Sequence, residues 1–159
     1  MEMMMADALE ECEWAPNAGK TKRCVGSIED MIHFATSLLG RNITARSTES
    51  TAGSSHEVML GTVKGINSRR VTKSVSCHQM LFPFLLYYCH SVPKVRVYEV
   101  DLLDPKTKVK INHGVAICHR DTSAWSATHW AFLALGSQPG LIEVCHWIFE
   151  NDLTWTIAD

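Results

Sequence analysis

The sequence VKINHGVAICH, at residues 109–119, places an apolar residue or a histidine at every second position. These positions are Val109, Ile111, His113, Val115, Ile117 and His119. Successive side chains of a β-strand point to opposite faces of the sheet. The pattern therefore predicts a strand that carries all six residues on one face and Cys118 on the other.

Two further segments have the character of strands. Residues 142–148 alternate apolar residues and a histidine with Cys145 and Trp147, and Asn151-Asp152 predicts a turn into a last strand through Trp155. The chain would then close with a hairpin. In residues 94–102 the apolar positions change phase, which predicts a β-bulge or burial on both faces. The predicted fold class is α+β, made mainly of antiparallel β-strands.

One amphipathic helix is clear near the N-terminus. Ser27 is a good N-cap with Asp30 three residues later, and Gly40 ends the pattern. The residues at helical spacing between them are Ile28, Met31, Ile32, Ala35, Leu38 and Leu39. Residues 1–26 are predicted to be irregular, and residues 125–135 fit the helical and the strand period equally. A length of 159 residues with 46% apolar composition predicts one domain over residues 1–159.

Charge, apolar runs and short motifs exclude several classes of function. Lysines and arginines are scattered and the net charge is −2, so no nucleic-acid partner is expected. Residues 1–13 are acidic and lack the basic start of a signal peptide. The longest apolar run, residues 80–88, contains Pro83 and falls short of the roughly 20 residues of a membrane-spanning helix. No phosphate-binding loop and no G-x-S-x-G or H-E-x-x-H sequence is present.

Four of the six cysteines are followed directly by a histidine. The pairs are Cys77-His78, Cys89-His90, Cys118-His119 and Cys145-His146, separated by 10, 27 and 25 residues. Chance would produce this on the order of once in ten thousand sequences of this composition. Thiolate sulfur and imidazole nitrogen are the side-chain ligands that copper and zinc prefer, but the spacing is not that of a zinc finger.

The strand pattern separates the two members of each pair. Adjacent residues of a strand face opposite ways, so the cysteines are the better disulfide candidates and the histidines the better metal candidates. The six disulfide candidates are Cys12, Cys24, Cys77, Cys89, Cys118 and Cys145. Cys12 and Cys24 flank a turn-rich segment and could close a local loop. The alternatives are reduced or packed cysteines and hydrogen-bonded core histidines.

Two other residues are candidates for a supporting role. Asp121 follows the third pair and could orient an imidazole through its carboxylate, although a turn or cap is the favoured interpretation. His129 could be a fifth metal ligand, and a packed histidine is at least as good an interpretation.

The order and spacing of the four Cys-His pairs closely resemble the signature of the plant BURP-domain family. The sequences around them resemble it too, over residues 77–90, 97–98, 116–125, 129–132 and 139–147. The resemblance covers about residues 6–156. Family members usually carry a signal peptide, a variable or repeat-bearing segment and further BURP sequence before the region of Cys12, so the resemblance implies an incomplete BURP domain.

The resemblance implies two functions. The first is a non-catalytic protein of the apoplast, the vacuole or the endomembrane system, active in the cell wall, development or stress response, with a cell-wall polymer or enzyme as its partner. The second is a copper-dependent peptide cyclase that crosslinks a Tyr or Trp side chain of a core peptide substrate. In the cyclases the paired histidines are implicated in copper binding. That likeness implies His78, His90, His119 and His146 as copper ligands and leaves catalytic activity open.

Overall fold

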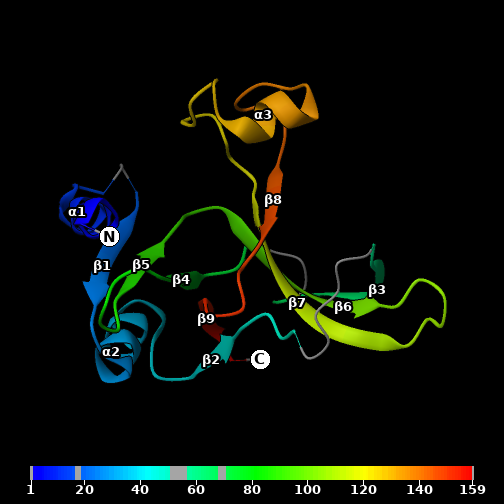
Figure 1. The fold of residues 1–159 in the computed structure, drawn as a ribbon, viewed down its shortest axis with the longest axis horizontal. Coiled ribbons are helices and arrows are strands. Elements are labelled where there is room, and N and C mark those ends of the chain that lie inside the picture. The colour runs from blue at the N-terminus through cyan, green and yellow to red at the C-terminus, as the bar shows by residue number, and fades with distance from the viewer. Residues whose placement is uncertain (1, 17–18, 51–56, 68–70, 159) are drawn as a thin grey trace. The chain divides into compact units, whose positions relative to one another are not determined.

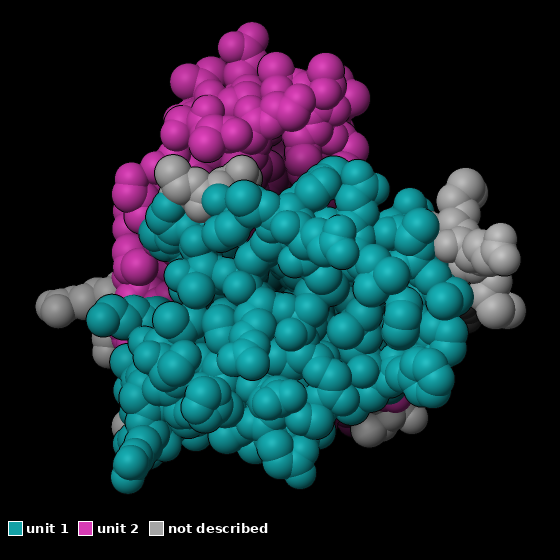
Figure 2. Space-filling view, turned by 90° about the vertical axis from the view of Figure 1, so that its left-hand side faces the viewer, with its two compact units in different colours: residues 1–48, 73–93, 149–159 teal, residues 49–72, 94–148 magenta. Residues whose placement is uncertain are grey.

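The computed structural model describes residues 2–16, 19–50, 57–67 and 71–158. The chain forms two compact units, which Figure 2 colours teal and magenta. Unit 1 consists of Met1–Thr48, Lys73–Pro93 and Phe149–Asp159, and unit 2 of Glu49–Thr72 and Lys94–Ile148. Each unit contains its own antiparallel sheet, so the predicted mainly antiparallel fold is confirmed.

Unit 1 contains a five-stranded sheet in the order β1-β5-β4-β9-β2 (Figure 1). Its strands are β1 (Thr21–Val25), β2 (Ile43–Arg46), β4 (Ser74–Gln79), β5 (Tyr87–Ser91) and β9 (Leu153–Ile157). Its helices are α1 (Glu2–Glu13) and α2 (Ile28–Leu39). The core of the unit gathers Val25, Met31, Phe34, Ala35, Val75, Cys77, Tyr87 and Cys89.

The caps predicted from the sequence set the bounds of α2. The Ser27 hydroxyl accepts a hydrogen bond from the Asp30 N–H at 3.1 Å, and the Gly40 N–H donates to the Thr36 carbonyl at the other end. Gly40 has a φ of 88°, a conformation that favours glycine. Both ends of the predicted helix are therefore confirmed.

The predicted apolar stripe of α2 is not confirmed as a whole. Met31 and Ala35 are buried, but three members of the stripe are more than a third exposed: Ile28, Ile32 and Leu38. Phe34, which lies outside the stripe, is buried instead. The buried face is thus rotated towards Phe34, because the helix packs against β1, β4 and β9. No helix in the described residues is long and apolar enough to cross a membrane.

Unit 2 contains a four-stranded sheet in the order β3-β6-β7-β8. Its strands are β3 (Met59–Gly65), β6 (Val95–Leu103), β7 (Lys110–His119) and β8 (Val144–Trp147), and its helix is α3 (Trp130–Leu135). The predicted strand over residues 109–119 is thus confirmed except for its first residue. β6 pairs with β7 in regular register from Val95 to Leu102, but its pairing with β3 shifts register opposite Val100 and Leu102. Val97 and Val100 are buried on opposite faces of β6, so both predicted causes of the change of phase, a bulge and burial on both faces, have support.

Three parts of the secondary structure differ from the predictions. Residues 1–26 were predicted to be irregular, but they contain α1 and β1, which the Cys12–Cys24 disulfide joins. The predicted closing hairpin is wrong, because β8 pairs with β7 in unit 2, whereas β9 lies between β4 and β2 in unit 1. The ambiguous residues 125–135 end in α3. Long-range strand pairing has outweighed the local turn at Asn151-Asp152 in setting the partners of β9.

Gly114 of β7 lies beneath the indole ring of Trp147 on β8. A Cβ atom at this position would lie 2.8 Å from the nearest ring carbon, which is closer than non-bonded carbon atoms approach one another. We expect Gly114→Ala to lower the free energy of unfolding by about 1–3 kcal/mol through overpacking, measured by urea denaturation. Gly26→Ala is the control, because its new Cβ would meet its nearest neighbour at 3.7 Å. An equal loss of unfolding free energy in the two variants would contradict the close contact between Gly114 and the Trp147 ring.

Candidate metal centre

In unit 1 a disulfide and two histidines occupy opposite faces of the same pair of strands. Cys77 of β4 lies directly opposite Cys89 of β5, and the two form a disulfide in the core. His78 and His90 each follow one of these cysteines, so their side chains lie on the other face. Their Nε2 atoms are 3.1 Å apart and their ring centroids 5.2 Å apart.

Unit 2 repeats this arrangement. Cys118 of β7 lies directly opposite Cys145 of β8, and the two form a disulfide. The Nε2 atoms of His119 and His146 are 3.2 Å apart, and their rings stack with centroids 5.3 Å apart. The register confirms that cysteines and histidines face opposite ways, and the three disulfides take up all six candidate cysteines.

The spacing of the facing nitrogens fits a metal ion. Two imidazole nitrogens bound at 2.0–2.1 Å with a tetrahedral angle between them lie about 3.3 Å apart. The observed Nε2 separations of 3.1 and 3.2 Å are close to this value. Imidazole suits both copper and zinc. The predicted ligands therefore come together two by two, His78 with His90 in unit 1 and His119 with His146 in unit 2.

One other cluster of donor atoms is a poorer candidate. Cys118, Cys145 and Glu143 lie close together, but both sulfur atoms belong to the disulfide and offer no thiolate. Glu143 accepts a hydrogen bond from the Arg96 guanidinium at 3.1 Å. The histidine pairs remain the better candidates for a metal site.

A buried carboxylate, Asp152, contacts the pair in unit 1. It lies in the turn before β9 and is only 4% exposed. Its Oδ2 is 2.8 Å from Nδ1 of His78, and its Oδ1 accepts the Gln79 N–H at 3.0 Å. Oδ2 also accepts the Phe149 N–H at 3.4 Å. The sequence pattern predicted only a turn at Asn151-Asp152 and gave no signal of this contact.

The surroundings of Asp152 favour its ionised form. Burial by itself raises the pKa of the carboxyl group, but hydrogen bonds from His78 and from the backbone N–H groups of Gln79 and Phe149 lower it by more. The net pKa is below the ordinary value. An ionised carboxylate only accepts hydrogen bonds, so Nδ1 of His78 is the donor.

Tyr88 lies beside His90 on the histidine face of the sheet, with ring centroids 5.2 Å apart. It pairs with Cys24 of β1, whose disulfide to Cys12 attaches α1 on this face. Burial raises the pKa of the Tyr88 phenol, and the negative charge of Glu11 in α1 raises it further. The phenol therefore stays protonated at neutral pH.

The two predicted supporting residues have other contacts. Asp121 accepts hydrogen bonds from the Lys94 ammonium at 2.7 Å and from the hydroxyl and N–H of Ser123. These bonds hold the pKa of Asp121 well below its ordinary value. His129 caps α3, since its Nδ1 accepts the Ala131 N–H, and Trp125 packs against both His129 and His119. The described contacts of Asp121 and His129 are those of a turn and of a packed histidine.

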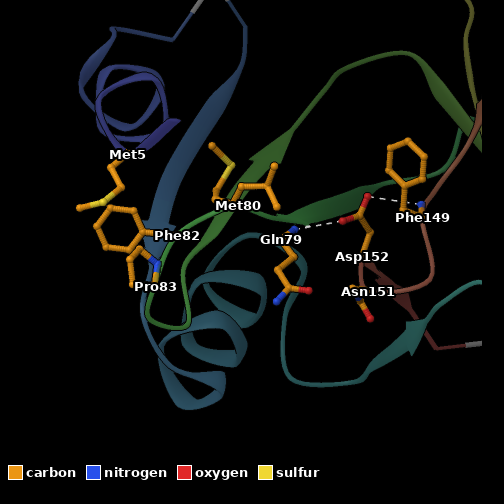
Figure 3. A pocket seen from close by; sticks show the side chains of 9 residues that line it. Met5, Gln79, Met80, Phe82, Pro83, Phe149, Asn151 and Asp152 are labelled. Atoms are coloured by element: carbon orange, nitrogen blue, oxygen red, sulfur yellow. Dashed lines mark hydrogen bonds between the residues drawn. The ribbon is translucent and has the colours of Figure 1, made fainter. Parts of the chain in front are cut away.

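A cavity of about 830 Å³ lies next to Asp152 in unit 1 (Figure 3). Gln79, Asn151 and Asp152 form its polar part, and the figure shows the two backbone hydrogen bonds of the Asp152 carboxylate. Its apolar part is lined by Met5, Met80, Leu81, Phe82, Pro83 and Phe149. Two of the large apolar side chains that line it, Leu81 and Phe149, are strongly exposed, and so is Phe84 in the same loop as Leu81.

This chain resembles several known plant proteins. The chain is 72% identical over all 159 residues to the polygalacturonase-1 non-catalytic subunit beta of Solanum lycopersicum. It is 70% identical over 159 residues to polygalacturonase 1 beta-like protein 1 of Arabidopsis thaliana. Over 155 residues it is 61% identical to BURP domain-containing protein 12 of Oryza sativa. The matches cover 98–100% of this chain and 25–26% of these relatives, so the chain spans about a quarter of their length.

The family model for the BURP domain matches residues 1–157. This match includes the four Cys-His pairs and both compact units. The resemblance noted in the sequence is therefore confirmed, and the chain belongs to the plant BURP-domain family.

Proposed function

We propose that this chain is part of a non-catalytic plant protein that binds a polygalacturonase. The observation that carries the proposal is the 72% identity, over the whole chain, to a protein named as a non-catalytic polygalacturonase subunit. Two more relatives at 69% identity have the same kind of name. Their names give no support to the peptide-cyclase alternative.

We place the protein in the cell wall. Three disulfides within 159 residues are typical of proteins that fold in an oxidising compartment. A polygalacturonase acts on a wall polymer, so a partner of that enzyme belongs in the same place. The apoplastic location implied by the family resemblance agrees with both points.

We further propose that each histidine pair holds a copper ion. His78 with His90, and His119 with His146, would supply two imidazole nitrogens each. The support is the separation of 3.1–3.2 Å between facing Nε2 atoms in both units. Bound copper would supply a cross-link between neighbouring strands, on the face opposite each disulfide.

We propose the loop of residues 80–86 as part of the surface that contacts the enzyme. Leu81, which lines the cavity next to Asp152, is 72% exposed, and Phe84 of the same loop is 78% exposed. Large apolar side chains gathered on a surface are a common mark of a protein-binding site. The loop belongs to unit 1, and the proposal needs no contribution from unit 2.

Binding to tomato polygalacturonase-1 tests the proposal. The protein that carries this chain is expected to form a complex with the enzyme, detected by light scattering after size exclusion and quantified by calorimetry. Phe84→Ser should weaken the complex about tenfold or more if this ring is an anchor of the interface. Leu133→Ser is the matched control, because Leu133 lies on α3 of unit 2 with a similar exposure of 74%. A protein that forms no complex would rule out the proposed partner.

A further inference from the structure

The two histidine pairs differ in the group that contacts the outer nitrogen of one ring. In unit 1, Nδ1 of His78 is 2.8 Å from the Asp152 carboxylate. In unit 2, Nδ1 of His146 is 3.1 Å from the backbone carbonyl oxygen of Trp147. The His78 ring is therefore supported by a buried negative charge and the His146 ring by a neutral dipole.

The Asp152 carboxylate is itself held firmly. It is 4% exposed, and the N–H groups of Gln79 and Phe149 fix its two oxygens. The strand register places Asp152 opposite His78. Cys77 of β4 pairs with Leu153 of β9, and because the strands are antiparallel, the residue after Cys77 faces the residue before Leu153. The backbone position of Asp152 follows from the pairing of β4 with β9, and two backbone N–H groups hold its carboxylate in place.

We propose that Asp152 is a positioning residue that keeps the proton of neutral His78 on Nδ1, so that the lone pair of Nε2 points to His90 and the unit 1 pair binds a divalent metal more tightly than it would without this carboxylate. A neutral imidazole carries one proton, and a carboxylate at Nδ1 fixes it there. The negative charge then raises the basicity of the ligating nitrogen. The affinity part of this inference rests on the proposed metal sites.

The substitution Asp152→Asn is expected to move the proton of neutral His78 from Nδ1 to Nε2. The new side chain can keep its oxygen on the Gln79 N–H and would then present its amide N–H₂ to Nδ1 of His78, at the cost of the longer hydrogen bond from the Phe149 N–H. Nδ1 must now accept, so the proton moves to Nε2, where it blocks metal binding. Asp121→Asn is the matched control, because Asp121 follows a Cys-His pair in the sequence but bonds to Lys94 and Ser123.

The tautomer can be measured without metal. In metal-free protein with ¹⁵N-labelled histidine, long-range ¹H–¹⁵N correlation spectra are expected to show His78 protonated on Nδ1. They should show it protonated on Nε2 in Asp152→Asn and unchanged in Asp121→Asn. An Nε2 proton on His78 in the unsubstituted protein would overturn the inference, and this measurement stands even if Asp152→Asn fails to fold.

The affinity is measured in proteins that keep one pair each. With His119→Ala/His146→Ala, calorimetric titration with Cu(II) reports on the unit 1 pair alone, and Asp152→Asn is expected to weaken binding about 10- to 100-fold in this background. The unit 2 pair alone, in His78→Ala/His90→Ala, is the control, and Asp152→Asn should leave its Cu(II) affinity unchanged. An unchanged Cu(II) affinity in Asp152→Asn would overturn the positioning role. Absence of any Cu(II) binding with an Nδ1 proton on His78 would instead overturn the proposed metal site.

Discussion

Replacing His78 and His90 together by alanine is expected to remove about half of the copper that the protein binds. Each pair supplies two facing nitrogens at 3.1–3.2 Å, and alanine leaves none of them. His119→Ala/His146→Ala should remove the other half, and the variant without all four histidines should bind almost none. Copper retained after loading with Cu(II) and desalting, measured by mass spectrometry, gives the result.

His33→Ala is the control for this experiment. His33 lies on the exposed side of α2, away from both pairs in the sequence, and its loss should leave the bound copper unchanged. If the variant without the four histidines still bound a stoichiometric amount of copper, these histidines would not be the copper ligands. Complete loss of copper in either double variant would contradict the proposal that each pair holds its own ion.

Replacing Cys77 and Cys89 by alanine is expected to destabilise unit 1 more than replacing Cys12 and Cys24. The two disulfides have the same sequence separation of 12, so each should contribute about 3 kcal/mol by restricting the unfolded chain. Cys77 and Cys89 are also fully buried in the core, and their replacement leaves a gap that costs about 1 kcal/mol or more. Urea denaturation followed by tryptophan fluorescence is suitable, because Trp155 packs against this core.

The Cys12–Cys24 variant is the matched control for the length of the closed loop. Loss of this disulfide should mainly free α1, which hydrogen exchange would show as loss of protection in residues 2–13 alone. Equal losses of stability in the two variants would mean that burial of Cys77 and Cys89 adds nothing. The Cys77–Cys89 variant should also bind copper less well at His78 and His90, since the bond holds β4 and β5 together behind them.

The sequence predicted those features that depend on neighbouring residues. Alternation in residues 109–119 located β7, and Ser27 and Gly40 located both ends of α2. The opposite orientation of each cysteine and its histidine also followed from adjacency alone. The pairing of Cys77 with Cys89 and of Cys118 with Cys145 did not, because it depends on which strands become neighbours.

Asp152 shows why the rest of the site could not be predicted. It lies 74 residues from His78 in the chain and reaches it only because β9 is added to β4. The same pairing made the predicted closing hairpin wrong. Asp121 was the nearer candidate in sequence, but Lys94 and Ser123 already satisfy its carboxylate. Distance along the chain was therefore a poor guide to the partner of an imidazole.

Taken with the proposed metal sites, the placement of each disulfide behind a histidine pair predicts the order in which the protein matures. Once the two sulfur atoms of a strand pair are oxidised, the strands are clamped and the imidazoles behind them form a ready-made chelate, so little entropy remains to be lost when an ion arrives. Before oxidation, free thiolates would compete with the imidazoles for the same soft metal. We therefore expect oxidative folding to come first and metal loading to follow it, with the second step dependent on the first.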